Sequence, residues 1–265
     1  MQKTVIPTIL VFAGNDPTGG AGLCADTQTL AKLGCHVAPV VTCTTVQNTH
    51  NVSAIFPLAG SIIIQQAEAV LADMAIAACK IGLLGSEEAL DAVVHVLRQH
   101  PELPVVVDPI LAAGGGKKMS TQAIRDKLLL NLLPLTTVLT PNSQEARALT
   151  GEKDLNKAAH KLLSLGCQAV CITGTHEDTL QVIHTLYQSQ TMPKQWICER
   201  LPYTYHGSGC TFASSVAGFM AKQESLATAI EKAQAFTFHA LKSAFFPGQG
   251  QALPNRVTTN FSSEL

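Results

Sequence analysis

The sequence predicts an α/β protein with a central, mostly parallel sheet flanked by helices on both faces. Strand-like and helix-like segments alternate along all 265 residues, the strand-like segments are apolar or β-branched, and no long linker divides the chain. Strands that are buried on both faces form such continuous apolar runs, and their alternation with helices is typical of parallel sheets. We therefore expect a single domain over residues 1–265, with a poorly ordered tail after about residue 256.

The first half of the chain begins this alternation. Thr8–Phe12 is an apolar run bounded by Ala13 and Gly14, as a doubly buried strand would be, and Gly34 stops the helix that follows. The next strands are β-branched or apolar, and one of them ends in Gly85. Strands are expected at Thr8–Phe12, Val37–Thr44, Ala78–Leu84 and Val105–Asp108, and helices at Ala21–Leu33, Ser61–Asp73 and Glu87–Gln99.

The second half continues the same rhythm. Pro141 cuts a short strand, two short helices follow it, and the last two strands are expected to form an antiparallel hairpin before two closing helices. Strands are expected at Thr137–Leu139, Ala169–Thr173, Leu180–Tyr187 and Trp196–Arg200, and helices at Thr121–Leu133, Ser143–Thr150, Leu155–Leu165, Thr211–Ala221 and Leu226–Ala244.

Composition narrows the class of protein. Hydrophobic residues make up 46% and charged residues 14%, which is enough apolar material for one large core. The formal net charge is −1 and no basic stripe is present, so we expect no nucleic-acid partner. We find no apolar run that would span a bilayer and no signal-peptide core, and so expect a cytoplasmic protein without a membrane partner.

Eight cysteines occur without any C-x-x-C pair, so a zinc site is not expected. Most lie among valine, alanine and isoleucine, and we interpret seven of them as buried thiols in a reducing compartment. Cys210 has a different setting, because it follows a glycine-rich turn at the start of a predicted helix.

Two polar segments follow the first two strands. Ala13–Gly22 contains four glycines around the start of a helix, which would let the backbone approach a ligand closely, although a tight turn explains them equally well. It is neither a P-loop nor a dinucleotide fingerprint. Thr44–Thr49 offers amides and hydroxyls that could contact the edge of a heterocycle, or could form a polar loop of no consequence.

Acidic and amide side chains follow two later strands. Asp108 and the segment Thr140–Glu145 place oxygen ligands of the kind that Mg²⁺ prefers just beyond strand ends. Purely structural roles are also open, because Asn142 suits an N-cap and Glu145 suits the first turn of a helix.

The segment His206–Thr211 is the most informative, because it precedes an apolar helix. Consecutive amides from Gly207 to Cys210 at a helix start would form an anion hole for a phosphoryl group. The helix dipole at that position would lower the pKa of the Cys210 thiol and favour a thiolate able to accept a hydroxyl proton. A glycine turn with a buried thiol is the plain alternative.

Together these segments resemble the hydroxymethylpyrimidine/phosphomethylpyrimidine kinase family of thiamine biosynthesis, within the ribokinase-like superfamily. The resemblance runs from Ile9 to about Asn255. The segments that carry it are AGNDPTGGAGLCAD (Ala13–Asp26), TTVQNT (Thr44–Thr49), KIGLLGS (Lys80–Ser86), VVDPIL (Val106–Leu111), LTPNSQEARALTG (Leu139–Gly151) and HGSGCT (His206–Thr211).

The resemblance implies an activity and a site. Such enzymes use ATP and Mg²⁺ to phosphorylate 4-amino-5-hydroxymethyl-2-methylpyrimidine and then its monophosphate, usually as homodimers. It implies that Cys210 is the catalytic base at an anion hole made by Gly207, Ser208 and Gly209. For the pyrimidine the resemblance implies Gln47 as hydrogen-bonding partner, together with Gly14, Ala21, Thr45, Leu83 and Ile110. For ATP it implies Asp108, Asn142 and Thr173. For Mg²⁺ it implies Glu145 and Asp108, partly through water.

The sequence departs from the family at a few of these positions. Asn15, Leu83 and Ser208 replace the usual serine, methionine and threonine. The segment Ile172–His176, which contains Thr173, lacks the lysine that the family often has near the phosphates. We hypothesise that Lys117 or Lys118 supplies that charge. Two alternatives remain open: a pyridoxal-type kinase on the same fold, and a paralogue that binds pyrimidine without turnover. A sugar kinase fits less well, since it would carry aspartate in place of Cys210.

Overall fold

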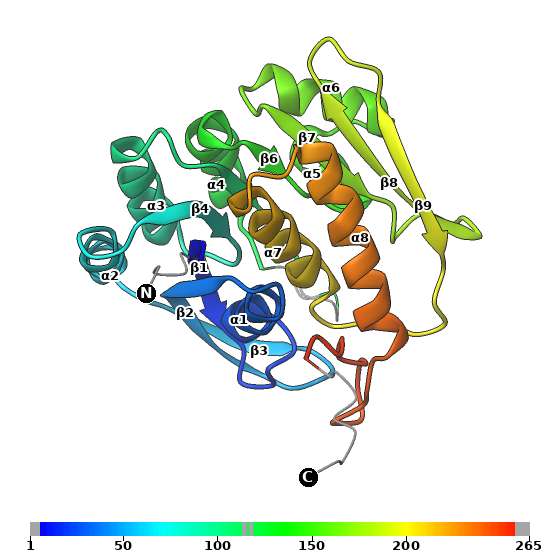
Figure 1. The fold of residues 1–265 in the computed structure, drawn as a ribbon, viewed down its shortest axis with the longest axis horizontal. Coiled ribbons are helices and arrows are strands. Elements are labelled where there is room, and N and C mark those ends of the chain that lie inside the picture. The colour runs from blue at the N-terminus through cyan, green and yellow to red at the C-terminus, as the bar shows by residue number, and fades with distance from the viewer. Residues whose placement is uncertain (1–5, 113–115, 117–118, 258–265) are drawn as a thin grey trace, which may run out of the picture.

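The computed structural model describes residues 6–112, 116 and 119–257. Over these residues the strands form one nine-stranded sheet in the order β3-β2-β1-β4-β5-β6-β7-β8-β9 (Figure 1). Neighbours from β2 to β7 run parallel, whereas β3, β8 and β9 are antiparallel additions at the two edges. The strands are β1 (Thr8–Asn15), β2 (His36–Gln47), β3 (Val52–Pro57), β4 (Ile76–Ile81), β5 (Val105–Val107), β6 (Val138–Leu139), β7 (Ala169–Thr173), β8 (Gln181–Gln188) and β9 (Lys194–Glu199).

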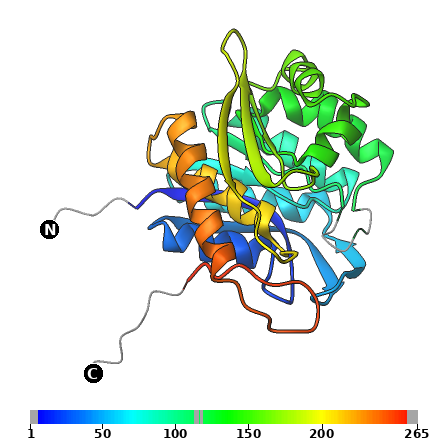
Figure 2. The same ribbon diagram turned by 90° about the vertical axis from the view of Figure 1, so that its right-hand side faces the viewer.

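Helices cover both faces of this sheet, as predicted. Figures 1 and 2 show α1, α7 and α8 together on one face, where their apolar side chains form one core layer with the strands. The opposite face carries α2 to α6 and a second, larger core layer. The helices are α1 (Gly22–Lys32), α2 (Gly60–Leu71), α3 (Glu87–Gln99), α4 (Gln122–Lys127), α5 (Ser143–Thr150), α6 (Leu155–Ser164), α7 (Ser208–Ala221) and α8 (Leu226–Lys242).

The chain order creates a switch point in the sheet between β1 and β4. After β1 the chain builds outward through β2 to β3 and then returns to the other side of β1, where it continues from β4 to β9. Loops that leave the carboxyl ends of strands on the two sides of a switch point diverge to opposite faces, which opens a ligand crevice between them. The first glycine-rich segment leaves β1 at this point.

The observed elements differ from the predicted ones at β3 and in the region 121–135. β3 was not predicted, and it pairs with the end of β2, so Thr44 to Gln47 are strand residues and not a loop. The helix predicted over Thr121–Leu133 breaks into α4, a π-helical turn at Leu128–Leu132 and a 3₁₀ turn at Leu133–Leu135. Pro134 explains the final break, because proline cannot donate to the preceding turn.

Other predictions have mixed outcomes. Five of the seven thiols expected to be buried are buried, but Cys24 and Cys198 are half-buried, so that part of the prediction is wrong. A poorly ordered tail was expected after about residue 256, and the residues beyond 257 lie outside the described ones. Lys117 and Lys118, the hypothesised source of a positive charge, also lie outside the described residues. Among the helices that the structure describes, none combines the length and apolar character that a bilayer span requires.

Candidate active site

The ends of β1, β4 and β5 meet the start of α7. The backbone N–H of Gly22, at the start of α1, donates to Cys210 Sγ. A Cβ placed on Gly209 would lie 3.6 Å from Asp108 Oδ2, at the end of β5. A Cβ placed on Gly207 would collide with the carbonyl oxygen of Gly20. Three sequence-predicted segments therefore lie in contact, and their close approach depends on glycine.

Helix α7 begins earlier than predicted, at Ser208. Gly207 is its N-cap and has a φ of +84°, a left-handed conformation that glycine adopts without strain. The Gly207 carbonyl accepts the first helical bond, from the N–H of Thr211 at 3.0 Å. The amides of Ser208, Gly209 and Cys210 have no acceptor within the helix, so this first turn has the form of an anion site.

The Cys210 thiol lies in this turn, and it is only 6% exposed. Burial raises its pKa to about 12, Lys80 is the largest influence in the opposite direction, and Asp108 adds to the rise. The prediction that the helix dipole would favour a thiolate is therefore wrong for the unliganded protein. The sequence placed Cys210 at the helix start, but it did not reveal that the sulfur is desolvated, and desolvation outweighs the dipole.

Asp108 and Glu145 form a buried acidic pair beside this turn. Both are less than a tenth exposed. Burial raises the pKa of both carboxyls, and for Glu145 the negative charge of Asp108 raises it further. Each Glu145 oxygen accepts one backbone N–H, from Leu111 at 3.1 Å and from Asn142 at 2.9 Å. The two carboxylates are thus close enough to repel each other where water cannot screen them.

This pair fits a magnesium ion. No cluster of three or more metal-ligating side chains occurs in the part of the chain that the structure describes. Mg²⁺ typically binds through one or two carboxylates and completes its shell with water and substrate phosphates, so two carboxylates suffice. A cation would also relieve the repulsion between the two acids.

Asn142 and Glu145 also have the structural role that the sequence left open. Asn142 Oδ1 accepts the N–H of Glu145 at 2.9 Å, and the reciprocal bond completes a capping box at the start of α5. Thr173, the last residue of β7, bonds through its N–H to Pro141 at 2.9 Å. Asn142 and Thr173 therefore lie side by side, at the sheet edge where Asp108 also lies.

The residues predicted to bind the pyrimidine gather around the ends of β1, β2 and β4. A Cβ on Gly14 would lie 2.7 Å from Cys43 Sγ and 3.3 Å from the Leu83 side chain, so glycine makes room there. Thr45 Oγ1 donates to the Asn15 carbonyl at 3.0 Å. The N–H of Ala21 donates to Asp16 at 2.8 Å.

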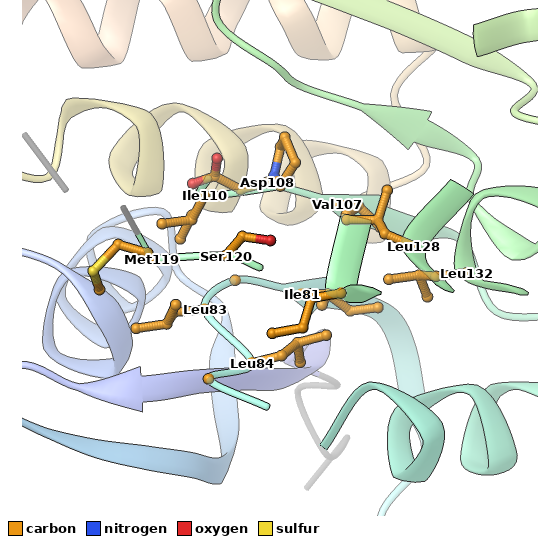
Figure 3. A pocket seen from close by; sticks show the side chains of 14 residues that line it. Ile81, Leu83, Leu84, Val107, Asp108, Ile110, Met119, Ser120, Leu128 and Leu132 are labelled. Carbon is orange, nitrogen blue, oxygen red and sulfur yellow. The ribbon is translucent and has the colours of Figure 1, made fainter. Parts of the chain in front are cut away.

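A small cavity is lined by some of these residues and by Asp108. It has room for about 20 Å³, and Figure 3 shows Leu83, Ile110 and Met119 at one end of it, with Asp108 nearby. Ile110 has a φ of +35°, which is unusual for a β-branched residue. Such strain persists only where the surroundings enforce it, and it often marks functional sites.

A polar chain that the sequence did not predict crosses the site. His206 Nε2 lies 2.7 Å from Asp16 Oδ2 and 3.3 Å from Gln47 Nε2. Burial disfavours the Asp16 carboxylate, but hydrogen bonds from His206 and Thr18 outweigh it and lower its pKa to about 2. Asp16 and His206 are separated by 190 positions, so no local sequence pattern joins them.

Lys80 is a second residue that the prediction missed, although the sequence held a signal for it. Its ammonium group is fully buried and lies 2.8 Å from Asp26 Oδ1, which also accepts a bond from Ser214 at 2.6 Å. A lysine inside an otherwise apolar strand must have a charged partner, because an unpaired buried charge is strongly unfavourable. Lys80 thereby ties β4 to α1 and, through Ser214, to α7, near enough to Cys210 to lower the pKa of its thiol.

Arg256 is a third residue near the site that was not predicted, and it is only 3% exposed. Its guanidinium donates to the carbonyl of Gly20 at 2.6 Å, to the carbonyl of Gly207 at 3.4 Å and to Thr211 Oγ1 at 2.8 Å. The chain beyond α8 thus returns to hold the first glycine segment against the start of α7.

The structure is similar to solved structures of pyridoxal kinase and phosphomethylpyrimidine kinase. The structure matches that of pyridoxal kinase from Staphylococcus aureus in complex with AMP-PCP and pyridoxal with a TM-score of 0.88 and 27% identity, covering 98% of this chain and 96% of that one. It also matches phosphomethylpyrimidine kinase from Clostridium difficile with a TM-score of 0.78 and 29% identity, covering 89% and 100%. Fold and site thus define a kinase of the ribokinase-like class.

The phosphomethylpyrimidine kinase family model matches residues 16–255, so the chain belongs to that family. The hydroxymethylpyrimidine/phosphomethylpyrimidine kinase of Haemophilus influenzae is 35% identical over 260 residues, covering 94% of this chain and 96% of that protein. The thiamine biosynthesis bifunctional protein ThiED of Geobacter sulfurreducens is 32% identical, and the chain spans about half (52%) of its length.

Proposed function

We propose that this protein transfers a phosphoryl group from ATP to the hydroxymethyl group of 4-amino-5-hydroxymethyl-2-methylpyrimidine, and then phosphorylates the monophosphate. The observation that carries this proposal is the meeting of three features: the Cys210 turn of α7, the Asp108–Glu145 acidic pair and the chain that leads to Gln47. They supply an anion site, a place for a cation and an amide for a heterocycle.

The roles of the residues follow from their contacts. The free amides of Ser208, Gly209 and Cys210 hold the phosphoryl oxygens. Positioning and charge stabilisation of this kind are the main contributions of a protein to phosphoryl transfer. Cys210 takes the hydroxyl proton. It must first lose its own proton, and the groups that favour the thiolate are Lys80 and the N–H of Gly22.

The acidic pair and its neighbours form the nucleotide side. Asp108 and Glu145 would hold Mg²⁺, which when bound offsets the negative charge of the ATP phosphates. Asn142 and Thr173 lie at the adjoining strand ends and would contact those phosphates.

Gln47 selects the ring. A carboxamide can donate to a ring nitrogen and accept from an exocyclic amino group at the same time, which matches an aminopyrimidine. Gly14, Ala21, Thr45, Leu83 and Ile110 would form the walls around that ring. The same fold in pyridoxal kinases is the reason to keep a pyridoxal-type kinase as the second candidate.

We also propose that the whole chain acts as one domain, as a cytoplasmic homodimer. Val46 and Phe56 support the dimer, because both are more than half exposed on the edge hairpin β2–β3. They lie on one face of it, since Phe56 pairs with Thr44 and Val46 is two residues further on. Light scattering should give twice the chain mass, and Phe56→Ser should shift it toward the monomer.

Parallel kinase assays test the proposed function. The protein is incubated with ATP, Mg²⁺ and either the hydroxymethylpyrimidine or pyridoxal, and ADP release is followed. We expect the pyrimidine to be preferred in kcat/KM. Preference for pyridoxal would support the second candidate, and absence of turnover with both would indicate a non-catalytic binding protein.

A further inference from the structure

The Gln47 side chain faces His206, and the hydrogen-bond partners of His206 determine which ring nitrogen carries a hydrogen. His206 Nε2 is shared between Asp16 Oδ2 at 2.7 Å and the Gln47 side chain at 3.3 Å. The His206 side chain is 15% exposed and that of Asp16 4%, so water does not easily replace either partner. The donors and acceptors of Asp16, His206 and Gln47 must therefore match one another.

Asp16 acts only as an acceptor. Its Oδ1 accepts from the N–H and the hydroxyl of Thr18, both at 2.8 Å, and its Oδ2 accepts from the N–H of Ala21 at 2.8 Å. The only lone-pair position left faces His206, and because the Asp16 pKa is lowered to about 2 the carboxyl carries no proton there, so the contact to His206 requires a donor. Nε2 of His206 therefore carries the hydrogen.

This hydrogen decides how the Gln47 amide must stand. An imidazole nitrogen that carries a hydrogen has no lone pair to accept with, so it cannot accept a bond from an NH₂ group. The oxygen and nitrogen ends of a carboxamide have the same shape, and the hydrogen-bond network determines which end lies where. The Nε2 hydrogen is directed mainly at Asp16 Oδ2, 2.7 Å away, and the Gln47 side chain at 3.3 Å can receive only its weaker branch. An oxygen can accept that branch and an NH₂ group cannot, so the network places Oε1 of Gln47 on the His206 side, with the NH₂ group directed away from it.

The orientation has a consequence for the ligand. Oε1 keeps one lone pair for an exocyclic amino group on the side of His206, whereas the NH₂ group donates to a ring nitrogen on the far side. The His206 ring lies against Gly20, and the Gly20 carbonyl lies against Gly207 at the start of α7, so the amino side of the ring would lie toward the anion site. In an aminopyrimidine with its hydroxymethyl arm on the next carbon, the arm then points toward the phosphoryl group.

We propose that His206, held by Asp16, is a positioning residue that fixes the orientation of the Gln47 amide and thereby selects 4-amino over 4-oxo rings and directs the reacting arm. This inference rests on the proposed function, and it adds a determinant of specificity to it. A 4-oxo ring presents a carbonyl and a ring N–H, which would need the amide in the reverse orientation.

The first test compares the 4-amino substrate with its 4-oxo analogue in wild type and in His206→Ala. We expect His206→Ala to lower the 4-amino/4-oxo ratio of kcat/KM by about tenfold or more, because the freed amide can turn, and to leave the KM for ATP within about twofold. His50→Ala, on an exposed turn, is the matched control and should keep the wild-type ratio. An unchanged ratio in a folded His206→Ala variant would overturn the proposal.

Gln47→Glu gives a second test that does not disturb His206. Glutamate can still accept from His206 and from an amino group, but it cannot donate to a ring nitrogen. We expect the KM for the aminopyrimidine to rise by about tenfold or more. If the amide nitrogen faced His206 instead, only the oxygen would face the ligand, and a KM within about twofold of wild type would refute the inference.

Binding without ATP separates this inference from the proposed function. Calorimetry without ATP measures the affinities for the 4-amino and the 4-oxo pyrimidine, because neither can be phosphorylated when ATP is absent. Loss of turnover with the 4-amino preference intact would remove the kinase function alone. Turnover with equal affinity for both rings would remove the role of His206 alone.

Discussion

Cys210 and Lys80 show how the surroundings set the chemistry of single residues here. Burial keeps the thiol protonated, with a pKa of about 12, and Lys80 is the largest influence toward the thiolate. Lys80 itself stays charged because Asp26 compensates for its burial. The candidate base is thus held in a protonated state, and its activation depends on charges that the substrate complex adds or removes.

Replacement of the thiol tests the role of Cys210. We expect Cys210→Ala to lower kcat by about 100-fold or more, because general-base transfer contributes at least that much, and to leave the KM for ATP nearly unchanged. Steady-state kinetics measures both values. Cys198→Ala, a half-buried thiol on β9, is the control and should behave as wild type. A kcat for Cys210→Ala within a few-fold of wild type would remove the base assignment.

At the scale of elements, two buried polar groups link strands to the helices above them. Lys80 on β4 reaches Asp26 on α1, and Ser214 on α7 completes the group. His184 on β8 packs edge-to-face on Phe212 of α7, with ring centroids 5.0 Å apart. Both groups hold α7, and therefore the candidate anion site, in place.

Removal of the buried ammonium should be strongly destabilising. We expect Lys80→Met to lower the free energy of unfolding by about 3–5 kcal/mol, because it leaves Asp26 charged and unpaired. The double variant Lys80→Met/Asp26→Leu should regain part of this loss. Urea unfolding measures all three proteins. If Lys80→Met lowered the free energy of unfolding by less than about 1 kcal/mol, the variant would not leave a buried, uncompensated charge on Asp26.

His184 should make stability depend on pH. Burial lowers its pKa from 6.5 to about 4, so between these values the unfolded chain binds the proton more readily than the folded one. The free energy of unfolding should therefore decrease as pH falls from 6.5 to 4, by about 3 kcal/mol from this residue.

The contribution of His184 can be isolated by difference. Unfolding curves of wild type and His184→Leu are compared at several pH values, and the difference between them should shrink or reverse toward pH 4. The exposed His36→Gln variant is the control and should follow wild type throughout. A constant difference between wild type and His184→Leu would show that His184 does not titrate in this range.

For the molecule as a whole, the sequence predicted the features that local pattern determines. Apolar runs and glycines located the parallel strands from β1 to β7 and the starts of most helices, because those signals lie within a few residues of each element. β3 escaped because Val52–Pro57 lies at an edge, is mostly not buried and ends in proline. Its strand character depends on pairing with β2, which no local pattern reveals.

The candidate site was predictable only in part, for a similar reason. The segments around Gly14, Asp108 and Cys210 have local motifs, and the structure brings them together. The Asp16–His206 contact and the Arg256 contacts join residues far apart in the chain, so they depend on the tertiary fold. The thiolate prediction for Cys210 was wrong because burial is also a property of the whole fold.

The most direct test of the proposed kinase is product identification by ³¹P NMR. The protein is incubated with ATP, Mg²⁺ and the hydroxymethylpyrimidine, and the spectra are followed in time. We predict a monophosphate ester resonance that appears first and a diphosphate that grows at its expense. ATP consumption with only inorganic phosphate, or no new resonance at all, would contradict the transfer of phosphate at the α7 turn.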